Sequence, residues 1–75
     1  MICVKVRLFA TLRENRDKEI IIELPDGATL LDVVKHLNIP KEEASLLLIN
    51  GVFAKLDKAL EDNDTVSIFP PVGGG

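Results

Sequence analysis

The chain has 75 residues, 47% of them hydrophobic and 28% charged, a composition that excludes a disordered segment and leaves room for a single domain. Its formal net charge of −3 at pH 7 argues against nucleic acid and anionic membrane as partners and favours a protein partner with a basic face. Because there is one cysteine, no apolar stretch of membrane-spanning length and no signal-peptide pattern, we expect a cytoplasmic protein.

Residues 2–24 predict two β-strands joined by a long loop. In the first strand the side chains alternate between two faces. The expected buried face carries Ile2, Val4, Val6 and Leu8. The opposite face carries Cys3, Lys5, Arg7 and Phe9. Residues 11–18 are polar and charged without an apolar period, so we expect a loop there. Residues 19–24 then predict the second strand, with Ile20, Ile22 and Leu24 on one face.

A helix is predicted directly after the turn at residues 25–27. Thr29 is a suitable N-cap, and Asp32 three residues later resembles the partner residue of a capping box. Four apolar residues then recur at helical spacing, which predicts one buried face. They are Leu30, Val33, Val34 and Leu37. Asn38 and Pro40 end the helix, and residues 40–44 predict one more short turn.

The remainder of the chain predicts further strands. Residues 45–56 are two short apolar runs around Asn50 and Gly51, a pair that readily adopts the positive φ angles of a tight hairpin turn. Residues 60–69 predict a turn and a last strand, in which Val66 and Ile68 alternate with Ser67 and Phe69. Pro70 and Pro71 end that strand because proline cannot donate to a ladder.

These elements, two strands, one helix and then more strands, predict an α+β domain. One helix can cover one face of a mixed sheet of four or five strands, and the best fit to this order is a ubiquitin-like β-grasp. We expect the domain to occupy residues 1–71 and a flexible tail to follow at 72–75.

The sequence offers few groups for catalysis or for metal binding. His36, the one histidine, is expected in the last helical turn and exposed to solvent. Cys3 has no second cysteine or nearby histidine in sequence, so a structural or surface thiol is expected. The acidic run at 61–64 lacks the ligand spacing of a calcium loop and is interpreted as a solvated turn. We therefore expect no metal site and no catalysis by this chain alone.

The sequence ends on three glycines, Gly73, Gly74 and Gly75, which suggests either a frayed end or a functional tail. Pro70 and Pro71 are stiff enough to project the tail outward, and residues 72–75 reach about 13 Å when extended. Glycine has no Cβ, so such a tail can enter a channel that other residues would block.

A tail that is ordered on binding loses entropy, which a docking surface must offset. Strand alternation places Phe9 and Phe69 opposite the core residues of their strands, and Phe53 follows the Asn-Gly turn. Together they predict a partner-binding patch. The alternative is a second hydrophobic layer covered by the chain's own loops.

The whole chain resembles the MoaD family, the small ubiquitin-like subunits of molybdopterin synthase, within the wider MoaD/ThiS group of sulfur carriers. The resemblance rests on VRLFATLRE at 6–14, LEDNDTVSIFPPV at 60–72 and the terminal Gly-Gly. It implies that an E1-like adenylyltransferase uses ATP and Mg²⁺ to adenylate Gly75, and that sulfur from a sulfurtransferase then replaces the adenylate to give a thiocarboxylate. By the same resemblance, the tail inserts into the large subunit of molybdopterin synthase and delivers sulfur to a pterin precursor.

The resemblance also implies site residues. Gly75 and Gly74 would form the reacting end, and no cofactor would be bound by this chain itself. The expected partner contacts are Phe9, Phe53, Phe69, Pro70, Pro71, Val72 and Gly73.

Two departures from the family pattern matter. Asn63 stands in the turn before the last strand, where the family often has glycine, but asparagine tolerates positive φ, so we expect the turn to form. Three final glycines are more frequent in carriers of the thiamine pathway.

Three alternatives stay open: a protein modifier joined to lysines through Gly75, a sulfur carrier for thiamine or tRNA thiolation, and an interaction domain with an idle tail.

Overall fold

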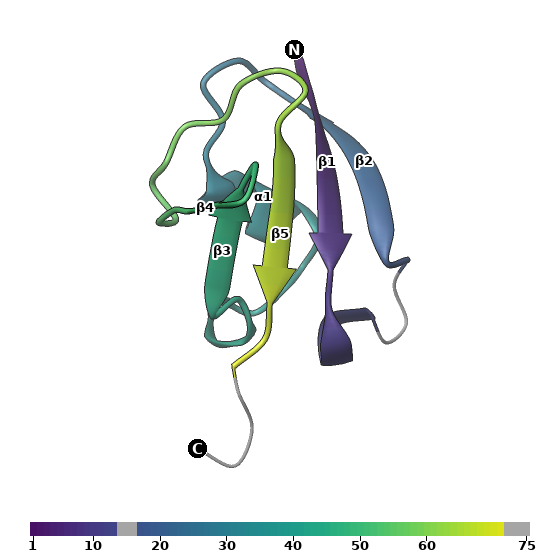
Figure 1. Cartoon of the computed structure of the whole chain (residues 1–75). Helices are drawn as coiled ribbons and strands as arrows, with labels where there is room; N and C mark the ends of the chain where they lie inside the picture. The colour runs from purple at the N-terminus through teal and green to yellow at the C-terminus, as the bar shows by residue number, and fades with distance from the viewer. Residues whose placement is uncertain (14–16, 72–75) are drawn as a thin grey trace.

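The computed structural model describes residues 1–13 and 17–71, and within them five strands form one sheet (Figure 1). The strands are β1 (Ile2–Leu8), β2 (Glu19–Leu24), β3 (Leu46–Ile49), β4 (Val52–Phe53) and β5 (Thr65–Phe69). Their order is β2-β1-β5-β3-β4. β1 and β5 are parallel, and the other neighbouring pairs are antiparallel, so the sheet is mixed as expected. The first two strands, which were predicted to be joined by a long loop, pair with each other as an antiparallel hairpin.

The helix α1 (Leu30–His36) covers one face of this sheet, and two short 3-10 helices, η1 (Ala10–Arg13) and η2 (Lys41–Glu43), lie in the connections (Figure 1). The core lies between α1 and the sheet and contains predicted side chains of β1, β2, β5 and the helix. Its fully buried members are Val4, Val6, Leu8, Leu12, Leu30, Val33, Val34, Val66 and Ile68. The expected ubiquitin-like β-grasp is confirmed.

The start of α1 is stabilised as the sequence predicted, with additional help from a distant loop. The Asp32 carboxylate accepts the Thr29 N–H at 2.8 Å, which is one half of the capping box. The next two helical N–H groups donate to backbone carbonyls of residues 56 and 58 in the loop after β4, at 2.9 and 3.1 Å. That loop therefore satisfies donors that would otherwise lack a partner at the helix start.

Two predicted turns have the expected backbone. Asn50 and Gly51, between β3 and β4, both have positive φ angles of 51° and 84°. Asn63, before β5, has φ 70°, so this asparagine adopts the positive φ angle that was expected of it.

The prediction that residues 11–18 form a purely polar loop is wrong at Leu12, which is fully buried. The first part of this segment is η1, closed by a hydrogen bond from the Leu12 N–H to the Phe9 carbonyl at 3.1 Å. This tight turn directs Leu12 into the core at the end of β1. A single apolar residue in a polar stretch has no period, so the sequence pattern did not reveal it.

The prediction of a solvated turn at 61–64 is wrong at Asp64, which is 9% exposed. Its carboxylate accepts the Glu61 N–H at 2.8 Å and the Asn50 side-chain amide at 2.9 Å. The Asn50 oxygen in turn accepts the Thr65 N–H at 3.0 Å. Asp64 thus joins the hairpin turn to the start of β5.

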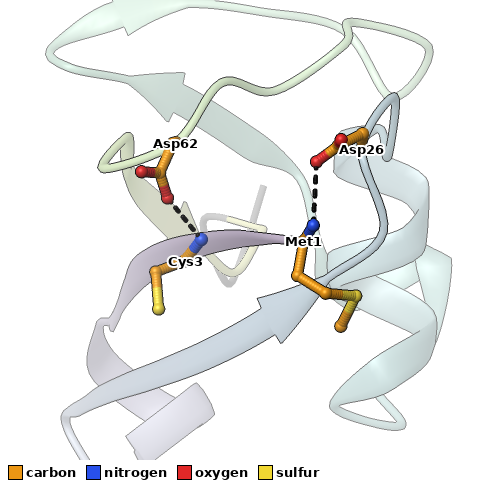
Figure 2. Close-up of polar contacts among 4 residues, drawn as sticks. All are labelled: Met1, Cys3, Asp26 and Asp62. Atoms are coloured by element: carbon orange, nitrogen blue, oxygen red, sulfur yellow. Dashed lines mark hydrogen bonds and ion pairs between the residues drawn. The ribbon is translucent and has the colours of Figure 1, made fainter.

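Two further aspartates hold the beginning of β1 from two different loops (Figure 2). Asp62 accepts the Cys3 N–H at 2.7 Å, and Asp26 lies 3.1 Å from the amino group of Met1.

Within the described parts of the chain, no helix is long and apolar enough to cross a bilayer.

Candidate functional site

The sheet face opposite α1, called the open face below, carries the candidate binding residues. Because side chains alternate along a strand, the residues next to the buried positions of β1, β3 and β5 point to this face. From the three central strands they are Cys3, Lys5, Arg7, Leu46, Leu48, Thr65, Ser67 and Phe69.

An apolar cluster occupies the open face near the ends of β1 and β5. The rings of Phe9 and Phe69 stack with centroids 4.2 Å apart and planes inclined by 9°. Leu46 lies opposite Phe69 in the sheet register, and Leu48 lies opposite Phe53, which is 74% exposed. We call these five residues the aromatic patch.

All three phenylalanines therefore lie where strand alternation and the turn predicted. Phe9 and Phe69 are half-buried against each other, whereas the exposure of Phe53 is incompatible with a second buried layer at that position. Their role as partner contacts stays a prediction. Sequence reasoning missed Leu46 and Leu48, because a continuous apolar run at 46–49 does not reveal which leucines face the core.

The chain leaves the sheet next to this patch. β5 ends at Phe69, whose carbonyl still accepts the Ser45 N–H at 3.0 Å, and it is followed by the half-buried Pro70 and the exposed Pro71. These two prolines end the strand, as predicted. The remaining predicted site residues, Val72, Gly73, Gly74 and Gly75, lie outside the described residues.

Polar groups surround the patch on one side. The Arg7 guanidinium carbon lies 5.9 Å from the centroid of the Phe9 ring, a distance at which a cation interacts with an aromatic face. Glu19, on the edge strand β2, lies 3.7 Å from the Arg7 Nε and 4.0 Å from the Lys5 Nζ.

The groups that sequence analysis weighed for catalysis lie apart. His36 is exposed on α1, whereas Cys3 is half-exposed on the open face, on the other side of the sheet. In residues 1–13 and 17–71, no three histidine, cysteine, aspartate or glutamate side chains form a group suited to a metal ion.

Comparison with known proteins adds to this geometry. The sequence model of the ThiS family matches residues 6–75. The chain belongs to the ThiS family. It is a sulfur carrier of the ThiS/MoaD type, as its resemblance to that group implied, and the match runs from the second half of β1 to Gly75.

Relatives of this ThiS-family chain carry two kinds of names. It is 35% identical to the molybdopterin synthase sulfur carrier subunit of Dictyostelium discoideum, over 95% of this chain and 94% of that protein. It is 31% identical to small archaeal modifier protein 3 of Haloferax volcanii, over 96% of this chain and 98% of that protein.

The fold has solved counterparts as well. A putative molybdopterin converting factor, subunit 1, from Pyrococcus furiosus superposes with a TM-score of 0.78 at 30% identity, covering 96% of this chain and all of that one.

Proposed function

We propose that this chain is the sulfur-carrying small subunit of a molybdopterin synthase. The observation that carries the proposal is the continuity of β5: Phe69, half of the stacked pair on the open face, is followed within six residues by Gly75, where the family match ends. In this proposal the aromatic patch is the docking surface, Gly75 is the reacting end, and Pro70 and Pro71 stiffen the connection between them. The near full-length similarity to the Dictyostelium sulfur carrier subunit also supports the proposal.

In this proposal the Gly75 carboxylate is first activated by a partner. A free carboxylate is a poor electrophile, so an E1-like enzyme transfers AMP from ATP to Gly75 and releases pyrophosphate, with Mg²⁺ bound by that enzyme. Sulfur from a sulfurtransferase, reduced to the sulfide level by a thiol reductant, then displaces AMP and leaves a thiocarboxylate, which is a soft nucleophile. The acids, bases and metal ions for these steps belong to the partners, and this chain supplies the reacting end.

The open face and the tail have separate tasks. The aromatic patch would anchor the domain on the large subunit, because aromatic side chains contribute a large share of binding energy at interfaces. Gly73 to Gly75 would then extend into the partner's active site, where the absence of a Cβ allows passage through a narrow channel. The binding energy of the patch would offset the entropy lost on ordering the tail, about 1 to 2 kcal/mol for each residue.

A second candidate function is protein modification, in which Gly75 is joined to lysine side chains of target proteins. The observation that favours it is the 31% identity with a small archaeal modifier protein over nearly the whole of both chains. The same fold, tail and adenylation serve both functions, so the two differ only in the nucleophile that meets the activated glycine.

The experiment that separates them is the mass of the C-terminal peptide of protein purified from its own host. A thiocarboxylate on Gly75 supports the sulfur carrier, and the purified thiocarboxylated protein should then convert the pterin precursor when mixed with the large subunit. A branched peptide that links Gly75 to a lysine, without any thiocarboxylate, would replace the first proposal by the second.

A further inference from the structure

Two cations occupy the middle of the open face. Lys5 and Arg7 are neighbours on the open side of β1, and their side chains are 46% and 54% exposed. Of the described residues that β1, β5 and β3 direct to this face, they are the only charged ones. The other positions there are apolar, hydroxyl-bearing or a thiol.

These two cations share one carboxylate at long range. Glu19 lies 4.0 Å from Lys5 and 3.7 Å from Arg7, near the outer limit of an ion pair. Glu23, the next acid of β2 on this side, lies opposite Cys3 in the register, and no ion pair within 4.0 Å joins it to a described residue. Exposed pairs of this kind contribute little, so among the described residues neither cation has a strong counter-charge.

The cations adjoin the aromatic patch. Arg7 lies beside the ring of Phe9, which stacks on Phe69. Across the sheet, Arg7 lies opposite Ser67, and Ser67 lies opposite Leu48. Leu48 in turn lies opposite Phe53, so one row of residues joins Arg7 to the patch. A partner that covers the patch therefore also removes water from Arg7, and in part from Lys5. Removing water from a cation without supplying a counter-charge carries a large desolvation penalty.

We infer that the protein surface that docks on the open face is apolar with at least one carboxylate placed against Arg7 and Lys5. This inference rests on the proposed function and takes the large subunit of molybdopterin synthase as the partner. The net charge of −3 for the whole chain predicts a basic partner face, but the acids responsible for it lie mainly outside the central strands. Local charge at the contact, rather than net charge, decides which partner surface fits.

The test measures the dissociation constant between the full chain and the large subunit of the same organism by calorimetry. We expect Arg7→Glu to weaken binding by about tenfold or more, because it places a carboxylate against the partner's acid. The matched control is Lys35→Glu, which makes the same change of charge at an exposed position of α1, on the other side of the sheet. We also expect the affinity of the unchanged chain to fall when NaCl rises from about 0.05 M to about 0.5 M.

Variants that only remove charge repeat the test if charge reversal disturbs the fold. Arg7→Gln should weaken binding, and Arg7→Lys should restore most of it. A zero-length carbodiimide should in addition join the Lys5 amine of the bound chain to an aspartate or glutamate of the large subunit, which peptide mass analysis identifies.

The outcomes separate this inference from the function on which it rests. If the unchanged chain does not bind the large subunit, both are overturned. If it binds, but Arg7→Glu and Arg7→Gln bind as tightly as Lys35→Glu and no cross-link to Lys5 forms, only the acidic partner face is overturned.

Discussion

On the sheet face that packs against α1, β1 and β5 present aliphatic side chains that are fully buried, whereas on the open face the same strands present Lys5, Arg7 and the stacked Phe69. Both faces arise from one alternating pattern, but they have different roles. The core face is completed by the chain's own helix, so it determines stability. In the proposed function the open face binds another protein, so its composition can change with that partner without loss of the fold.

The largest effect that separates the two roles is expected at the chain end. Deleting Gly74 and Gly75 should abolish sulfur transfer to the pterin precursor, because no carboxylate remains in the position that the activating enzyme and the large subunit reach. The thermal unfolding temperature should not change, since the core lies within residues 1–71. Cofactor formation in cells that contain only the truncated protein would contradict this view of the tail.

Two neighbouring leucines of β3 provide a direct comparison of the faces. Leu47 is 6% exposed in the core, and Leu46 is 39% exposed on the open face. Leu47→Ala should lower the free energy of unfolding by about 2 to 5 kcal/mol, because it removes buried methyl groups and leaves a cavity. Leu46→Ala should lower it by less than about 1 kcal/mol. Chemical denaturation of both variants measures the difference, and equal losses would mean that the open face is part of the core.

A substitution at Phe53 tests whether the open face contributes to binding and not to stability. Because this ring is 74% exposed, Phe53→Ala should leave the unfolding free energy nearly unchanged. It should weaken binding to the large subunit by about 1 to 3 kcal/mol, as the truncation of an interface anchor does. Calorimetric titration measures the affinity of the variant for the large subunit, and an unchanged affinity would exclude Phe53 from the interface.

The smallest effect is expected at the polar network that belongs to neither face. Asp64→Ala should destabilise the domain by about 1 to 2 kcal/mol, because the Glu61 N–H and the Asn50 amide lose their acceptor. The matched control is Asp57→Ala in the same connection, where the side chain is exposed. If both substitutions shift the denaturation midpoint equally, the network does not stabilise the hairpin that carries Phe53.

Local patterns could be predicted from the sequence because neighbours along the chain decide them. The alternation of β1, β2 and β5, the capping box of Thr29 and Asp32, and the turn at Asn50 and Gly51 each depend on residues within one turn or strand. The resemblance in the segments at 6–14 and 60–72 likewise pointed to the family that the full comparison identified. Leu12, Asp64 and the orientation of the leucines in β3 could not be predicted, since each depends on contacts with distant elements.

The sequence by itself thus determined the order of the elements, the composition of the two strand faces and the glycine end, because these are properties of local spacing and residue type. Only the tertiary structure decided that β1 and β5 lie side by side in parallel, which brings Phe9 and Phe69 from opposite ends of the chain into one stack. That pairing is long-range, and no local period encodes it. By aligning the carboxyl ends of both strands, it also places the cations of β1 on the same surface as Phe69, the last residue of β5.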